Sequence, residues 1–119
     1  MQQEEKEKQS MLQKAINIAT HEFRDKVDKQ GMPYILHLFR VMFKVAKHGQ
    51  EFMQIALLHD LLEDCPDWTM DRLISEGFSP IVVVTISRLT HVGGIDYQKY
   101  IESIYENPVA TIVKGADLE

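Results

Sequence analysis

Four titratable residues interrupt an otherwise apolar run at residues 55–65, which reads IALLHDLLEDC. On a helix, His59 and Glu63 are four residues apart and share one surface, as do Asp60 and Asp64. Such groups are costly to place beside a hydrophobic core unless something neutralises their charge. Imidazole and carboxylate groups suit Mn²⁺, Fe²⁺, Zn²⁺ or Mg²⁺, so the segment could form part of a divalent-metal site. Taken alone, it fits better a solvated helix end with an intrahelical pair between His59 and Glu63.

Two residues elsewhere in the chain strengthen the metal interpretation. His37 lies between Leu36 and Leu38, 22 residues before His59, a separation that lets two antiparallel helices bring the imidazoles together. Asp117 ends a further apolar segment, VATIVKGAD. Two histidines and two aspartates from three helices would form a four-ligand site with room for water or substrate oxygens. Taken singly, each has a plainer interpretation, such as a hydrogen-bonded core histidine.

Helices are expected to position these residues, because apolar positions recur at spacings of three and four. We expect an all-α fold, a compact bundle of six or seven helices with short connections. The predicted helices cover residues 11–27, 34–47, 51–62, 70–76, 81–86, 97–106 and 108–118. Residues 81–86 are β-branched and would form a strand by propensity alone. The preceding Ser79-Pro80 is a helix-start signal and favours a helix there.

Length and composition limit the classes of function that the chain can have. The 119 residues fit one domain, residues 11–119, after a polar leader at residues 1–10 that is expected to fray or be disordered. With 13 Lys and Arg against 18 Asp and Glu, the net charge of −5 disfavours nucleic acid polymers as partners. No apolar stretch is long enough to span a bilayer, so no membrane partner is expected. The single cysteine, Cys65, fits a reducing, cytoplasmic location.

Three motifs in order, DKQGMPYILH, ALLHDLLED and VKGAD, resemble those of the HD-domain metal-dependent phosphohydrolases. Within that family they are most similar to the small RelA/SpoT-type hydrolases of guanosine tetra- and pentaphosphate. The resemblance implies one divalent metal ion, usually Mn²⁺, held by four ligands: His37, His59, Asp60 and Asp117. It also implies that Glu63 and Asp64 orient the attacking water and handle protons. By the same resemblance, Lys29 lies beside the nucleotide.

Other polar residues near the motifs have plainer expected roles. Lys114 is the best further candidate to contact a substrate phosphate, because it lies one turn before Asp117. Tyr34 is expected to pack at a helix start, with a substrate-facing ring as the alternative. Solvated helix faces are expected for three further cations: Arg24, Lys26 and Arg40. Asp28 stands where many relatives carry Arg, which weakens the expectation of an arginine stacked on guanine.

The resemblance implies that the chain removes the 3′-diphosphate of guanosine tetra- or pentaphosphate as pyrophosphate. Two alternatives remain open from the residues: an HD-type hydrolase of another nucleotide, such as a 5′-nucleotidase, or a non-catalytic module used for binding or regulation. Relatives continue with an Asn and further helices beyond the residue matched by Asp117. The bundle is therefore expected to be truncated at its C-terminus, with a more open pocket and weaker metal binding. The sequence does not indicate the oligomeric state.

Overall fold

A computed structural model describes the backbone of residues 2–119 and the side chains of residues 11–119. Its helices are α1 (Gln2–Glu22), α2 (Ile35–Val45), the 3₁₀ helix η1 (Ala46–His48), α3 (Gln50–Leu58), α4 (Leu61–Asp64), α5 (Met70–Ser75), α6 (Pro80–Leu89), α7 (Tyr97–Tyr105) and α8 (Pro108–Leu118). Within the described part there is no strand beyond one isolated bridge between Val27 and Pro33. The prediction of an all-α fold is confirmed.

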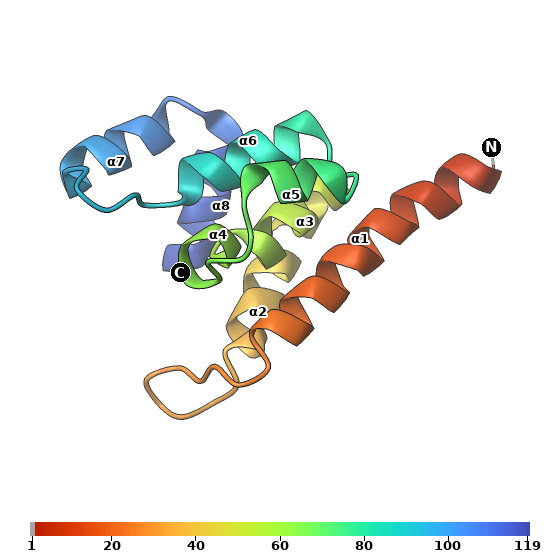
Figure 1. Cartoon of the computed structure of the whole chain (residues 1–119), viewed down its shortest axis with the longest axis horizontal. Coiled ribbons are helices and arrows are strands. Elements are labelled where there is room, and N and C mark those ends of the chain that lie inside the picture. Colours follow the sequence, from red (N-terminus) through yellow and green to blue (C-terminus); the bar gives the residue numbers. More distant parts are fainter. Residues whose placement is uncertain (1) are drawn as a thin grey trace.

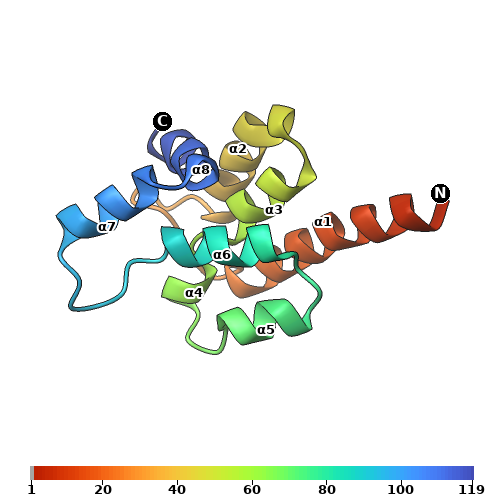
Figure 2. The same cartoon turned by 90° about the horizontal axis from the view of Figure 1, so that it is seen from above.

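Helix α3 runs through the centre of the molecule. Its residues Ile55, Ala56, Leu57 and Leu58 are all fully buried, as expected of a helix that is surrounded on every side. It packs against α1, α2, α6 and α8. In Figures 1 and 2, α1 extends away from the other helices at its N-terminal end, and α7 projects on the opposite side. Because α3 is central, His59, the residue after its C-terminal end, lies in the interior.

Local signals set several helix ends where the sequence predicted them. The Oγ1 atom of Thr69 accepts a hydrogen bond from the Arg72 amide at 3.1 Å and caps α5. The Oδ1 atom of Asn107 caps α8 in the same way, accepting from the Ala110 amide at 3.0 Å. Helix α6 begins at Pro80 despite its β-branched residues, so the prediction of a helix at residues 81–86 is confirmed.

Two predicted helices have different bounds in the structure. The helix predicted over residues 11–27 ends at Glu22. Val27 is 57% exposed in the following loop, so its position four residues after Phe23 matched the apolar spacing of the helix by coincidence. Tyr34 donates its amide to the Lys26 carbonyl at 2.9 Å, which closes this loop. The helix predicted over residues 51–62 divides into α3 and α4 at His59 and Asp60, so the described part has one α-helix more than the upper limit of the predicted six or seven.

The leader predicted at residues 1–10 is only partly described. Residues 2–10 form the first part of α1, while Met1 and the side chains of residues 2–10 lie outside the described part. The prediction that this leader frays or is disordered remains a prediction. No helix in the described part is both long enough and apolar enough to cross a membrane.

Candidate functional site

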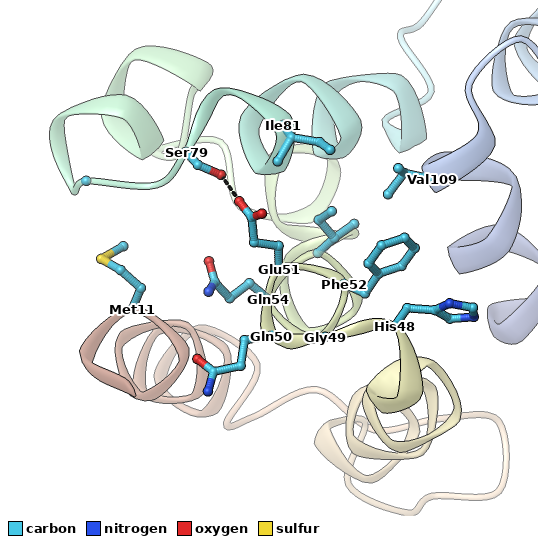
Figure 3. A pocket seen from close by; sticks show the side chains of 12 residues that line it. Met11, His48, Gly49, Gln50, Glu51, Phe52, Gln54, Ser79, Ile81 and Val109 are labelled. Atoms are coloured by element: carbon cyan, nitrogen blue, oxygen red, sulfur yellow. Dashed lines mark hydrogen bonds between the residues drawn. The ribbon is translucent and has the colours of Figure 1, made fainter. Parts of the chain in front are cut away.

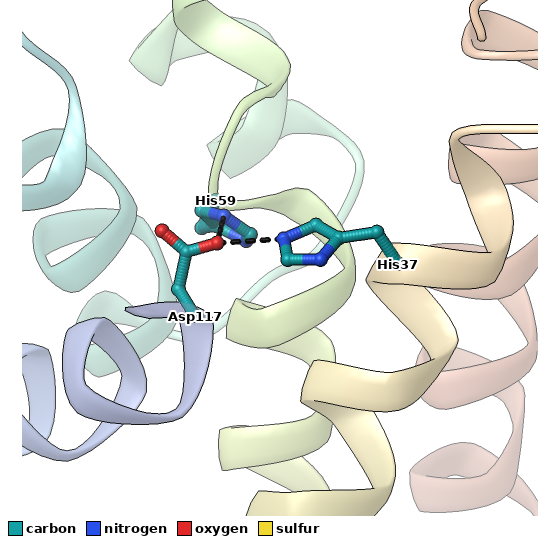
Figure 4. Close-up of side chains that lie close together, drawn as sticks. All are labelled: His37, His59 and Asp117. Carbon is teal, nitrogen blue, oxygen red and sulfur yellow. Dashed lines mark hydrogen bonds and ion pairs between the residues drawn. The ribbon is translucent and has the colours of Figure 1, made fainter. Parts of the chain in front are cut away.

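Three of the predicted metal ligands converge from three helices. His37 lies in the first turn of α2, His59 follows the last residue of α3, and Asp117 lies in the last turn of α8. One ligand atom from each residue lies within 4.8 Å of the other two. Figure 4 shows the two imidazoles directed at the same carboxylate. Nε2 of His37 donates to Oδ1 of Asp117 at 2.7 Å, and Nε2 of His59 lies 3.3 Å from the same oxygen.

The local geometry of His59 leaves one ring nitrogen available. The side chain is buried, and its Nδ1 atom donates to the Ala56 carbonyl at 2.6 Å. Nε2 is buried and has no hydrogen-bond partner of regular geometry in the described part. Because one nitrogen is bound to a carbonyl, the other can present its lone pair to a metal, a pattern common to histidine ligands. A buried polar atom without a partner is costly, and a cation between the three residues would remove that cost.

The electrostatics of the cluster favour a positive charge within it. Burial lowers the pKa of His59. The neighbouring Asp117 and Asp60 carboxylates and the Ala56 carbonyl have a larger, opposite effect, so the pKa of His59 lies above its ordinary value. Burial raises the pKa of Asp117, but His59, His37 and Lys114 outweigh it and hold the pKa well below its usual range. Asp117 is therefore an anionic centre that either protonated imidazoles or a metal cation can neutralise.

Asp60, the fourth predicted ligand, lies beside the cluster of His37, His59 and Asp117 but is not one of the three residues whose ligand atoms lie within 4.8 Å of one another. Its Oδ2 atom is 3.4 Å from Nε2 of His59. The same oxygen accepts a hydrogen bond from the hydroxyl of Tyr34. Asp60 therefore borders the position that a metal would take, with Tyr34 on its other side.

The predicted catalytic carboxylates lie on α4, directly after Asp60. Oε1 of Glu63 accepts a hydrogen bond from the backbone amide of His91 at 2.6 Å, in the loop after α6. Oδ2 of Asp64 pairs with Nζ of Lys26 at 2.5 Å. His59 and Glu63 do not pair with each other, and His59 is only 3% exposed. The predicted alternative of an intrahelical pair is therefore wrong, and His59 is not solvated, although Glu63 and Asp64 are exposed.

The two predicted substrate-binding lysines occupy different surroundings. Lys114 lies at the cluster, with Nζ 3.4 Å from Oδ2 of Asp117. Lys29 is exposed in the loop between α1 and α2, and it forms no hydrogen bond or ion pair with the described residues of the cluster. Asp28 organises that loop, because its Oδ1 atom accepts from the amides of Gln30 and Met32, each at 2.9 Å.

Sequence reasoning missed two side chains at the site. Lys26 was expected on a solvated face, but it pairs with Asp64 and its Nζ lies 4.0 Å from the centre of the Tyr34 ring. Tyr34 was expected to pack at a helix start; it does pack there, yet its hydroxyl contacts Asp60. Lys26 lies just before the first motif and Tyr34 lies within it, and only the closure of their loop places them beside the second.

A cavity of about 820 Å³ lies at the other end of α3 from His59 (Figure 3). Its walls include Met11, Phe52, Gln54 and Val109. None of the predicted site residues lines it, so it is separate from the candidate metal centre.

Comparisons with curated proteins and with solved structures agree with these observations. No protein-family model matches the chain. It is 33% identical over 116 residues to guanosine-3′,5′-bis(diphosphate) 3′-pyrophosphohydrolase of Aquifex aeolicus (strain VF5), across 89% of this chain. The chain spans only 16% of the length of that relative.

A solved structure of a metazoan SpoT orthologue, described as hydrolysing ppGpp and acting in starvation responses, matches with a TM-score of 0.72. The match has 23% sequence identity and covers 90% of this chain and 65% of that one. The predicted resemblance to guanosine polyphosphate hydrolases is therefore confirmed, and the chain has the all-α fold of the SpoT orthologue.

Proposed function

We propose that the chain is a divalent-metal-dependent phosphohydrolase whose metal is held by His37, His59, Asp60 and Asp117. The observation that carries this proposal is the buried, unpartnered Nε2 atom of His59 beside two carboxylates. Imidazole nitrogens and carboxylate oxygens together suit Mn²⁺, which we propose as the metal. Such a metal, when bound, lowers the pKa of a water molecule and polarises a phosphoryl oxygen.

The other residues at the site have matching roles in this proposal. Glu63 and Asp64 hold the attacking water in line with the scissile bond and accept its proton. The contact between Glu63 and the His91 amide fixes the direction of that carboxylate. Lys114, which is only one turn from Asp117, neutralises phosphate oxygens. Lys29 reaches the nucleotide from the loop between α1 and α2.

The proposed substrates are guanosine tetra- and pentaphosphate, and the first of these is the substrate named for both relatives. Water replaces the 3′-oxygen at the proximal phosphorus of the 3′-diphosphate. Pyrophosphate leaves, and the 3′-oxygen takes up a proton to give GDP or GTP. The single cysteine and a nucleotide substrate fit a cytoplasmic enzyme.

The test is a pyrophosphate-release assay on metal-stripped protein with and without added Mn²⁺. Guanosine tetraphosphate should be cleaved only when Mn²⁺ is present, and His59→Ala should abolish both cleavage and Mn²⁺ binding. Metal binding without cleavage of any nucleotide would instead identify a non-catalytic module. Absence of Mn²⁺ binding by the wild-type protein would refute the proposal altogether.

A second candidate function is hydrolysis of another nucleotide by the same centre. Asp28 favours it, because its carboxylate faces its own loop and leaves no guanidinium at that position to stack on guanine. A panel of nucleoside mono-, di- and triphosphates assayed beside guanosine tetraphosphate separates the two. Faster release of phosphate from a nucleoside monophosphate would favour the second candidate.

A further inference from the structure

Tyr34 connects the start of α2 to the fourth predicted ligand. Its hydroxyl donates to Oδ2 of Asp60, the oxygen that lies 3.4 Å from Nε2 of His59. An ionised carboxylate oxygen offers two lone pairs. Tyr34 occupies one of them and leaves the other for a metal. The hydrogen bond is therefore compatible with metal binding and directs the oxygen toward the cluster.

The Asp60 carboxylate is not held by α4. Asp60 precedes that helix, but its backbone is itself helical, with φ −96° and ψ −1°, and its side chain makes no capping hydrogen bond. An aspartate that caps a helix ordinarily has a non-helical backbone. The Tyr34 hydroxyl is the hydrogen-bond partner of the Asp60 side chain instead. Without that hydroxyl, the carboxylate would be free to rotate away from His59.

The Tyr34 ring is held in place independently of Asp60. Ring contacts place it against Phe23, with centroids 5.7 Å apart, and against His37, with centroids 5.4 Å apart. Nζ of Lys26 lies 4.0 Å from the ring centre, and the Tyr34 amide donates to the Lys26 carbonyl. A ring fixed on three sides can direct its hydroxyl without a further loss of conformational freedom.

We propose that Tyr34 is a positioning residue: its hydroxyl keeps the Asp60 carboxylate turned toward His59, so that Asp60 can complete the metal centre. This inference rests on the metal-dependent function proposed above. Partners of metal-ligating carboxylates typically contribute about 10–100-fold to metal affinity. Tyr34 is expected to contribute within that range.

The experiment compares Mn²⁺ binding by the wild type, Tyr34→Phe and Tyr105→Phe, measured from the electron paramagnetic resonance signal of free Mn²⁺. The ring contacts of Tyr34 survive in phenylalanine, so Tyr34→Phe should keep its helical circular dichroism spectrum. Its Mn²⁺ dissociation constant should rise about 10–100-fold. Tyr105 is 68% exposed on α7, and the same deletion there should leave Mn²⁺ binding unchanged.

A second comparison tests whether Tyr34 acts through Asp60. In an Asp60→Asn background, Tyr34→Phe should change the residual Mn²⁺ affinity by less than about twofold, because the positioned carboxylate is already gone. An equal loss in both backgrounds would show a general structural role and overturn the inference. Unchanged Mn²⁺ affinity in Tyr34→Phe, with normal binding by the wild type, would also overturn it. Failure of the wild type to bind Mn²⁺ would refute the proposed function itself.

Discussion

Replacement of His59 by leucine should separate metal binding from folding. The substitution removes the unpartnered Nε2 atom, whose burial costs about 1–3 kcal/mol. It also removes the hydrogen bond from Nδ1 to the Ala56 carbonyl and the electrostatic attraction between the imidazole and the Asp117 carboxylate 3.3 Å away, each worth about 1 kcal/mol. These effects oppose one another. The metal-free stability of His59→Leu is therefore expected within about 1 kcal/mol of the wild type.

The response to Mn²⁺ should differ far more. A ligand at 100 times its dissociation constant stabilises the folded state by about 2.7 kcal/mol. For a domain of this size, that raises the melting temperature by roughly 10 °C. The wild type should show this rise and His59→Leu should not. Differential scanning fluorimetry on metal-stripped protein, with and without Mn²⁺, measures both quantities in one experiment.

His48→Leu is the matched control, because His48 is exposed at the opposite end of α3, where its ring packs against Phe52. This variant should retain the full Mn²⁺ response. Stabilisation of His59→Leu by Mn²⁺ to the same extent as the wild type would refute the assignment of His59 as a ligand. A metal-free destabilisation above about 3 kcal/mol would refute the balance of the opposing effects.

Three further outcomes are expected. Glu63→Gln keeps an oxygen that can accept from the His91 amide but loses the charge, so pyrophosphate release should fall at least about 100-fold while the Mn²⁺ shift in melting temperature stays. Lys26→Met removes a partly exposed ion pair with Asp64, and the free energy of unfolding in urea should fall by about 1 kcal/mol or less. Burial is the main cause that raises the pKa of Tyr100 to about 12. The contribution of neutral Tyr100 to the free energy of unfolding is complete below pH 10, and it is lost as the pH rises toward 12, because the tyrosine ionises more readily in the unfolded chain. Wild-type stability in urea should therefore fall by about 2 kcal/mol more than that of Tyr100→Phe between pH 9 and 11.5.

Much of the fold was predictable because the signals are local. Apolar spacing locates the helices, and the pairs Ser79-Pro80 and Asn107-Pro108 mark two helix starts. The loop between α1 and α2 was not predictable in the same way. Val27 continues the apolar spacing of α1, yet it is exposed and bridges to Pro33, because backbone contacts across the loop outweigh helical periodicity there.

The cluster of His37, His59 and Asp117 was predictable for a related reason. Each residue lies on a mostly apolar helix whose buried face must meet the others in a domain of one core. The contacts of Lys26 and Tyr34 had no such signal. Their partners lie 38 and 26 residues away, and their positions depend on how one irregular loop closes.

The division between α3 and α4 is what makes the proposed chemistry of the second motif possible. In one continuous helix, His59 and Glu63 would face each other across a single turn and neutralise one another. The structure ends α3 at Leu58, and Nδ1 of His59 turns back to the Ala56 carbonyl. Glu63 is then free to bond the His91 amide, 28 residues further along the chain. In the proposed mechanism, one sequence motif thus supplies a buried nitrogen to a metal and a separate carboxylate to water, because the helix that carries it is broken between them.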